Sequence, residues 1–219
     1  MTNIPKADDQ VDQWRSVMFL YDSALKKVNT KIEILNNEFA NRYDYNPIEH
    51  IKSILKSAES IVMKLKKDGY EVTIENMMEC LSDIAGIRII CSFTSDIYQI
   101  AGMIAGQGDV TVLHVKDYIK NPKPNGYKSY HMVVTVPVYL TDGPVETKVE
   151  IQIRSVAMDF WASLEHKIAY KFEGNAPENL LKELKACADM VDILDAKMFS
   201  LNEAITAFAR EQKERSEES

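Results

Sequence analysis

The chain has 219 residues, of which 46% are hydrophobic and 27% are charged, and its net charge at pH 7 is −7. With 8 glycines and 7 prolines, this composition excludes a disordered or collagen-like protein and fits one catalytic domain with helical extensions. No apolar run approaches the ~20 residues that cross a bilayer, and no basic and then apolar leader opens the sequence. The three cysteines show no CxxC spacing, so we expect a cytoplasmic protein without a structural zinc site.

Hydrophobic periodicity predicts helices at both ends of the chain and a mixture of strands and helices between them. The predicted helices span 9–41, 47–68, 74–82, 95–106, 156–171 and 178–210, and the predicted strands span 84–93, 110–118, 129–138 and 145–154. Pro47 is expected in the first turn of the second helix, with Ile54 in its apolar stripe. The last nine residues are polar and are expected to fray.

These elements predict an α+β fold with a mixed, mainly antiparallel sheet of about four to five strands, flanked by helices. We expect a helical arm over residues 1–44, a central domain over 45–172, and a second helical arm with a frayed tail over 173–219. Both arms carry more apolar surface than a small sheet can cover, which predicts association between copies of the chain.

Two basic segments stand out in an otherwise acidic chain. Residues 52–67 hold five lysines against Glu59, and residues 114–131 hold four lysines against Asp117. The acidic total argues against a stable nucleic-acid partner, because such affinity comes mostly from neutralised phosphates. The two segments instead indicate a confined site for a small, highly phosphorylated ligand. The alternative is that these lysines only solvate helix and loop surfaces.

Two predicted strands bring acidic and basic side chains to one face of the sheet. Residues 148–154 alternate, which places Glu150, Gln152 and Arg154 on one face, and His131 is expected on the same side. The strand 84–93 adds Arg88, with Asp83 directly before it. Two carboxylates among cations fit metal-assisted phosphoryl-type transfer. The alternative is a strand with one face in water.

Aromatic residues gather at the loop before residue 129 and on the helix after the active strand. Tyr127 follows Asn-Gly in a lysine-rich loop, where it would stack on a nucleobase or cap the sheet edge. Phe160, Trp161 and Tyr170 have helical spacing, which is more typical of a core than of a ligand platform. His166 is expected to be a packed or surface histidine.

Several ordered motifs resemble the synthetase domain of the RelA/SpoT superfamily, and most closely the small alarmone synthetases. The motifs are 46–50 (NPIEH), 83–88 (DIAGIR), 116–119 (KDYI), 126–131 (GYKSYH), 149–154 (VEIQIR) and 157–167 (AMDFWASLEHK). The resemblance covers residues 45–172. It implies a nucleotidyltransferase-like synthetase domain there and assembly into a homotetramer.

The resemblance also implies transfer of the β,γ-pyrophosphate of ATP to the 3′-hydroxyl of GDP or GTP, which makes AMP and ppGpp or pppGpp with Mg²⁺ as cofactor. Asp83 is then a Mg²⁺ ligand, and Glu150 is the general base or a second metal ligand. The implied ATP-binding residues are Lys56, Lys64, Arg88, Lys116 and Lys123. The implied guanine-nucleotide residues are Tyr127, Lys128, His131, Gln152 and Asp159. Asp159 would read guanine by accepting from N1–H and the N2 amino group together.

One position departs from the family pattern. Relatives carry an arginine in an Arg-Val/Ile-Lys-Ser run, where this chain has Ile54-Leu55-Lys56-Ser57. The arginine would help to clamp the adenine, and its loss would weaken ATP binding by about 0.5–2 kcal/mol. We therefore expect a raised KM for ATP with activity retained.

Two other functions remain open from the sequence. The first is a pyrophosphokinase with a different acceptor, either an adenosine nucleotide or the 3′ end of a tRNA. The second is a nucleotide-binding oligomer with weakened turnover, for which Ile54 is the only indication. The acidic net charge argues against tRNA, and the retained acidic residues and Tyr127 argue against lost turnover.

Overall fold

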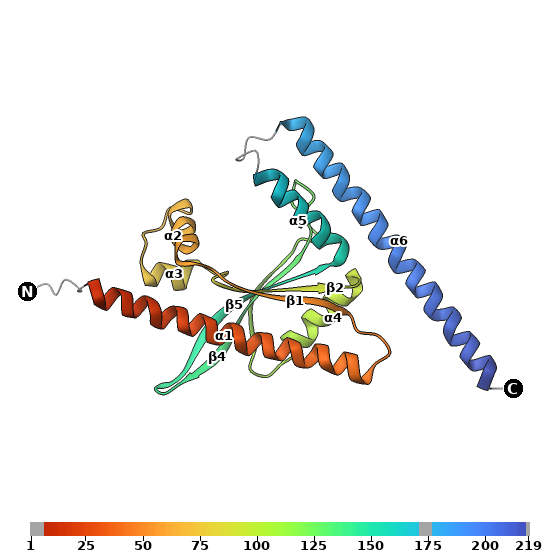
Figure 1. The fold of residues 1–219 in the computed structure, drawn as a ribbon, viewed down its shortest axis with the longest axis horizontal. Coiled ribbons are helices and arrows are strands. Elements are labelled where there is room, and N and C mark those ends of the chain that lie inside the picture. Colours follow the sequence, from red (N-terminus) through yellow and green to blue (C-terminus); the bar gives the residue numbers. More distant parts are fainter. Residues whose placement is uncertain (1–6, 171–176, 218–219) are drawn as a thin grey trace, which may run out of the picture.

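The computed structural model describes residues 7–170 and 177–217 (Figure 1). The helices are α1 (Ala7–Arg42), α2 (Ala58–Lys67), α3 (Ile74–Cys80), α4 (Thr94–Ala105), α5 (Val156–Tyr170) and α6 (Glu178–Glu217). The strands are β1 (Ile48–Leu55), β2 (Ala85–Cys91), β3 (Thr111–Asp117), β4 (Tyr130–Leu140) and β5 (Gly143–Ser155). The α+β class is confirmed, and so are the predicted elements apart from the two differences described below.

The five strands form one sheet in the order β1-β2-β5-β4-β3. Three of the four neighbouring pairs are antiparallel, and β2 and β5 run parallel at the centre. β4 and β5 form the hairpin that the sequence predicted, with Leu140 paired to Gly143 across the turn. The last strand in the chain therefore lies in the middle of the sheet.

One face of the sheet packs into the main hydrophobic core. Alternate residues along the strands, such as Ile87, Ile89 and Ile151, are at most 1% exposed. Apolar residues of α1 and α4, including Val28 and Ile100, belong to the same cluster. Much of the apolar stripe of α1 is therefore covered within the chain. The surplus apolar surface predicted for the two arms lies mainly on α6.

The helix predicted over residues 47–68 is wrong in its first half. Residues 48–55 form the edge strand β1, and only α2 is helical, starting after Ser57, whose hydroxyl accepts from the amide of Ser60. The apolar spacing of three and four across this segment joins two separate elements. Ile54 does not lie in a core stripe, because its side chain is 41% exposed on β1.

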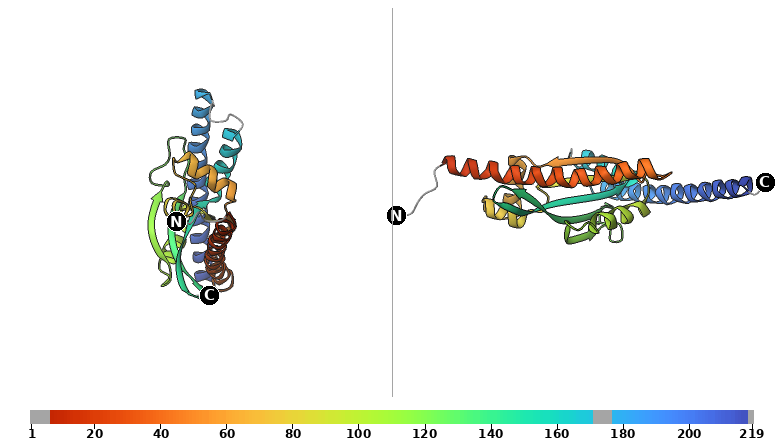
Figure 2. Two further views of the ribbon diagram at one scale, coloured as in Figure 1. Left: turned by 90° about the vertical axis from the view of Figure 1, so that its left-hand side faces the viewer. Right: turned by 90° about the horizontal axis from the view of Figure 1, so that it is seen from below.

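The C-terminal helix is longer than predicted. α6 continues to Glu217, so most of the polar tail is helical rather than frayed. Its sequence beyond residue 210 is rich in Glu, Gln, Lys and Arg, which are good helix formers even without a core to pack against. Figure 2 shows this end of α6 projecting beyond the sheet. The break predicted near Gly174 lies outside the described residues.

Among residues 7–170 and 177–217, none of the helices is both long enough and apolar enough to cross a membrane.

Candidate active site

Two transverse rows of residues cross the sheet on the face opposite the main core. The first row runs Ile54–Gly86–Glu150–Val133, and the second runs Lys52–Arg88–Gln152–His131–Lys116. Residues paired across neighbouring strands point to the same face of a sheet. The parallel pairing of β2 and β5 therefore places Arg88 beside Gln152 and aligns the end of β2 nearest Asp83 with Glu150.

Asp83 precedes β2 and is held by two lysines from the segment that follows β1. The Nζ of Lys56 donates to Oδ2 of Asp83, and the Nζ of Lys64 on α2 donates to the same oxygen at 2.6 Å. The amide of Lys56 donates to the carbonyl of Ile84 at 2.9 Å, which fixes Lys56 beside the carboxylate. Burial raises the pKa of Asp83, but the two lysines outweigh it, so the pKa lies below its usual value.

Glu150 on β5 is held by different partners. Its Oε1 lies 3.3 Å from Nδ1 of His131, and its Oε2 accepts from Nε2 of Gln152 at 2.9 Å. Burial and the nearby charge of Asp83 raise the pKa of Glu150, whereas the hydrogen bonds from His131 and Gln152 lower it further than burial raises it. The net pKa is below the usual value, and Glu150 is ionised at neutral pH.

Both carboxylates line one cavity of about 200 Å³. The other lining residues are Lys64, Asp68, Cys80, Ser82, His114, Lys116, His131 and Val133. The two acidic groups that the sequence singled out therefore converge on the same space. The lining is mainly polar, and its cations suit a phosphorylated ligand.

Tyr127 lies at the end of the loop between β3 and β4, beside this cavity. Its ring meets the rings of Tyr118 and His131 edge-on, with centroids 6.0 and 5.9 Å away. The Nζ of Lys123 lies over the ring at 4.9 Å, and the guanidinium of Arg154 lies over it at 5.1 Å. The hydroxyl of Tyr127 is 2.8 Å from Nε2 of His131, so Tyr127 is connected through His131 to Glu150.

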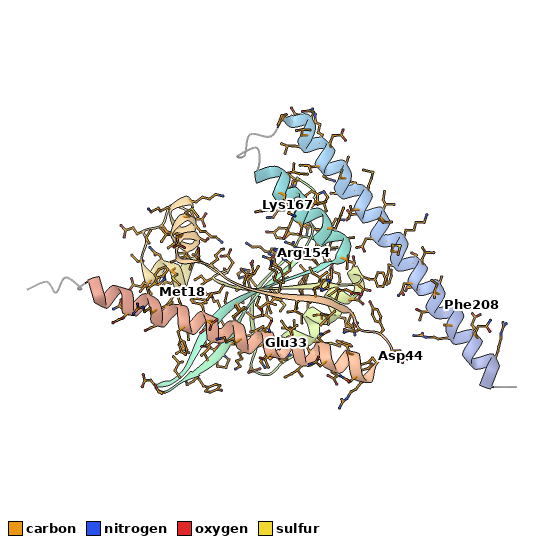
Figure 3. The ribbon with its side chains drawn as sticks, viewed as in Figure 1. Met18, Glu33, Asp44, Arg154, Lys167 and Phe208 are labelled. Carbon is orange, nitrogen blue, oxygen red and sulfur yellow. The ribbon has the colours of Figure 1, made fainter. Side chains whose placement is uncertain are left out.

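The central position of Arg154 was not predicted from the sequence. Arg154 is 5% exposed and donates to the Tyr127 hydroxyl at 2.6 Å, to Oδ1 of Asp159 at 3.1 Å and to Oε1 of Gln152 at 3.3 Å. Figure 3 shows it between the sheet and α5. The alternation of the β5 sequence placed it on the correct face, but nothing in the pattern indicated that it would be buried.

Asp159 on α5 joins this network to Arg88 on β2. Its Oδ1 lies 3.7 Å from a terminal nitrogen of Arg88. Within the described part of the chain, the Nε of Arg88 is buried and has no hydrogen-bond partner. Burial and the nearby charge of Arg154 lower the pKa of Arg88. A guanidinium in this position has donor capacity to offer a ligand.

Comparison with known proteins explains this combination of residues. Residues 53–175 match the family described as "Region found in RelA / SpoT proteins". The chain belongs to the RelA/SpoT family. It is 44% identical over 205 residues to GTP pyrophosphokinase YwaC of Bacillus subtilis, covering 94% of this chain and 98% of that protein. It is 34% identical over 205 residues to GTP pyrophosphokinase YjbM of the same species, covering 92% and 96%.

Solved structures of the RelA/SpoT family share the fold. Small alarmone synthetase 2 from Bacillus subtilis matches with a TM-score of 0.79 and 46% identity, over 88% of this chain and 99% of that one. Small alarmone synthetase 1 from the same species, bound to its product pppGpp, matches with a TM-score of 0.83 and 32% identity, over 89% and 99%. The resemblance found in the sequence motifs is confirmed.

Ile54, which replaces the arginine of the RelA/SpoT pattern, faces the site. Across the first row it is separated from Glu150 only by Gly86, which has no side chain. An exposed isoleucine here offers an apolar surface where the family pattern implies a planar cation.

The predicted lysines do not all lie at the cavity of this RelA/SpoT chain. Lys64 and Lys116 line it, and Lys56 reaches Asp83. Lys123 lies at the Tyr127 ring. Lys128, in contrast, forms an ion pair with Asp192 of α6, with Nζ 2.5 Å from Oδ2.

The aromatic residues of α5 divide between two environments. Trp161 is 6% exposed and belongs to a small cluster with Ala162 and Ala188, against which Tyr127 packs. Its Nε1 donates to the carbonyl of Leu184 at 3.0 Å. Phe160 is 59% exposed, so it is not a core residue of the chain. The side chain of Tyr170 lies outside the described part.

Asp83 and Glu150 are the residues that fit a magnesium ion. No cluster of three or more His, Cys, Asp or Glu side chains forms a metal site within residues 7–170 and 177–217. In the same ranges, Oδ1 of Asp83 is buried and has no hydrogen-bond partner. Mg²⁺ is commonly held by one or two carboxylates together with substrate phosphates, so two carboxylates beside a phosphate cavity fit this ion.

Proposed function

We propose that this protein is a GTP pyrophosphokinase of the small alarmone synthetase type. It transfers the β,γ-pyrophosphate of ATP to the 3′-hydroxyl of GDP or GTP and releases AMP and ppGpp or pppGpp. The observation that carries the proposal is the convergence of Asp83 and Glu150 on one cation-lined cavity, in a chain 44% identical to a GTP pyrophosphokinase over nearly its whole length.

The reaction needs a group that accepts the proton of the 3′-hydroxyl. The oxygen–Pβ bond forms as the bond from the α,β-bridging oxygen to Pβ breaks, and AMP leaves with that oxygen. Glu150 is ionised and fixed at both oxygens, so it is suited to take the proton. His131 connects it to Tyr127 and aligns the base with the bound acceptor.

Asp83 would hold Mg²⁺, and Glu150, which lines the same cavity, would be a second ligand. When bound there with the triphosphate, the ion would neutralise part of the phosphate charge. Lys56 and Lys64 now neutralise Asp83, and they are positioned to contact the ATP phosphates beside it.

The acceptor nucleotide would occupy the Tyr127 side of the cavity. Guanine stacks on Tyr127, where Lys123 and Arg154 now lie over the ring. Asp159 accepts from N1–H and the N2 amino group of guanine, which adenine cannot match. Gln152 and His131 orient the ribose and its phosphates, and Lys116 adds positive charge at the cavity. The donor adenine lies against Arg88, whose Nε is buried without a partner in the described residues.

The exposed face of α6 favours self-association, which we propose yields a homotetramer. Its exposed apolar residues recur at spacings of three and four: Met190, Ile193, Leu194, Met198, Leu201, Ile205 and Phe208. Figure 3 shows Phe208 on the part of α6 that lies away from α5. Light scattering should give a mass near four subunits, and Ile193→Glu together with Ile205→Glu should lower it. A monomer at micromolar concentration would contradict this proposal.

The proposed compartment is the cytoplasm, which supplies ATP, GTP and Mg²⁺. All three cysteines are unpaired, as a reducing compartment requires.

The decisive experiment incubates the protein with ATP and Mg²⁺ and separates the nucleotides by chromatography. With GDP or GTP present we expect AMP and ppGpp or pppGpp in equal amounts. Parallel reactions contain ADP or tRNA in place of the guanine nucleotide. Pyrophosphate on one of these acceptors would change the acceptor assignment. Absence of AMP in every reaction would support the nucleotide-binding oligomer.

A further inference from the structure

The loop between β3 and β4, which carries Tyr127, is in direct contact with the C-terminal helix α6. Gly126 has a φ of +92°, in the region that favours glycine. A Cβ at this position would lie 2.6 Å from the Cβ of Ala188 and 3.1 Å from Cδ of Lys185. The loop backbone and α6 therefore touch at a point where neither side has room for a larger residue.

A second contact lies on the other side of Tyr127. Lys128 pairs with Asp192, and the two side chains are 23% and 31% exposed. Ala188 and Asp192 are four residues apart and therefore share one face of α6. This face, which we call the loop-holding face, contacts the residue before Tyr127 through Ala188 and the residue after it through Asp192.

The loop-holding face is itself anchored to the rest of the domain. Trp161 on α5 donates to the carbonyl of Leu184, one turn before Ala188. One turn after Asp192, Asp195 accepts from Ser155 at the end of β5 at 2.8 Å and from Thr94 at 3.1 Å. Contacts on both sides of Ala188 and Asp192 thus fix this part of α6 against β5, α4 and α5.

The hydrogen bonds within the loop are local. Gly126 donates to the carbonyl of Lys123 at 2.8 Å, and the amide of Tyr127 donates to Oδ1 of Asn125 at 3.1 Å. These bonds shape a turn but do not place that turn against the cavity. Tyr127 is packed against the cluster of Trp161, Ala162 and Ala188, so α6 contributes to the surface on which its ring rests.

We propose that Ala188 and Asp192 of α6 are positioning residues for guanine-nucleotide binding. By holding residues 126–128 they keep the Tyr127 ring where the acceptor base stacks. This inference rests on the proposed function, because it assigns α6 a role in acceptor binding. It also changes the role of Lys128, which acts through Asp192 to place the loop rather than by contacting a phosphate.

The proposal separates acceptor binding from donor binding. The ATP side is built from β1, α2 and β2, and none of its described hydrogen bonds or ion pairs at Asp83 involves α6. Displacing the loop should therefore raise the KM for GDP and leave the KM for ATP nearly unchanged. A merely structural role for α6 would affect both substrates together.

The test replaces Ala188 with leucine, which cannot fit against Gly126, and Asp192 with asparagine, which keeps the shape and removes the charge. We expect the KM for GDP to rise about tenfold or more in A188L and about threefold in D192N. The KM for ATP should stay within about twofold in both, and D192E should recover part of the loss. The matched controls are A186L and E183Q at exposed positions of the same helix.

Binding of GDP alone provides a second readout that needs no turnover. Trp161 packs in the Tyr127 cluster, and a Trp14→Phe background leaves it as the single tryptophan. Its fluorescence should titrate with GDP, with a Kd raised in A188L and D192N by the same factors as KM. If the protein transferred no pyrophosphate, this titration would still test the role of α6.

Light scattering and circular dichroism of each variant show whether assembly and folding are retained. If A188L does not fold, D192N and D192E still decide the question. An unchanged Kd for GDP in folded D192N, or equal changes in the KM values for GDP and ATP, would overturn the proposal.

Discussion

The two sides of the cavity hold their carboxylates in different ways. Asp83 on the donor side is neutralised by two lysines that meet at a single oxygen, while its other oxygen has no hydrogen-bond partner in the described chain. Glu150 on the acceptor side has one partner at each oxygen, a histidine and an amide. Both pKa values are lowered, by the two lysines at Asp83 and by the hydrogen bonds from His131 and Gln152 at Glu150.

The difference indicates two kinds of chemistry. When a metal ion binds the Asp83 carboxylate, the two lysines can turn towards the phosphates. This side is therefore suited to an exchange of ionic partners. The partners of Glu150 instead fix its orientation and are themselves connected to Tyr127. In the proposed reaction, this side keeps one geometry while the proton moves to Glu150.

Glu150→Gln should have the largest effect, because it removes the proton acceptor and preserves the shape of the strand. We expect kcat to fall by about 10²–10⁴-fold, the usual contribution of general base catalysis. The measurement is AMP formation with ATP and GDP. Glu146→Gln, at an exposed position on the same strand, is the control and should keep full activity. If E150Q instead kept its rate at saturating Mg²⁺ and only needed a higher Mg²⁺ concentration, Glu150 would be a metal ligand and not the base.

Asp83→Asn should lower kcat by about 10²-fold or more and raise the Mg²⁺ concentration needed for half-maximal rate. Lys56 and Lys64 would lose their partner, which should lower the free energy of unfolding by about 1 kcal/mol because both are partly exposed. Thermal melts and Mg²⁺ titrations measure the two effects. Asp68→Asn, which lines the same cavity, should change neither by a comparable amount. An unaltered Mg²⁺ requirement in D83N would remove the proposed ligand.

His131→Asn should shift the acid limb of the kcat–pH profile to higher pH. Removing His131 removes a contribution that lowers the pKa of Glu150, while burial, which raises it, remains. The base is then protonated at a higher pH, so kcat begins to fall at a higher pH in the variant than in the wild type. Profiles of the variant and the wild type check the direction. His166→Asn, exposed on α5, is the control, and a shift to lower pH would contradict the assignment.

Ile54→Arg should give the smallest effect, an improvement on the donor side only. A planar cation at the start of the row that contains Glu150 should lower the KM for ATP by about two- to thirtyfold, equivalent to about 0.5–2 kcal/mol. Met63→Arg, at an exposed position on α2, controls for added charge. If I54R gave no gain in ATP affinity, Ile54 would not be the cause of weakened ATP binding.

The fold was largely predictable because most elements have a clear period. The β5 sequence alternates, and its buried residues follow that alternation from Thr147 to Ile153. The prediction for residues 48–55 was wrong because this segment has no clear period of its own. β1 is an edge strand in which Ile48 alone is buried, so its apolar residues do not alternate and merge with the helical period of α2.

The site was predictable where its residues lie in strands and motifs. Alternation places His131 and Glu150 on one face, and the structure brings them together. The contacts of α6 were not predictable, because Ala188 and Asp192 carry no motif and meet the loop only through the tertiary fold. Gly126 was predicted to lie in a loop, but the sequence does not reveal that α6 packs against its backbone.

The central place of β5 has a consequence for how the enzyme is made. A ribosome completes β1, β2 and β4 before it completes β5, yet β5 must pair with both β2 and β4. The β4–β5 hairpin can form locally, but its docking against β2 joins distant parts of the chain and is expected to be a slow step in folding. Until that docking, Asp83 and Glu150 are on separate pieces of structure, so an unfinished polypeptide lacks the assembled pair of carboxylates.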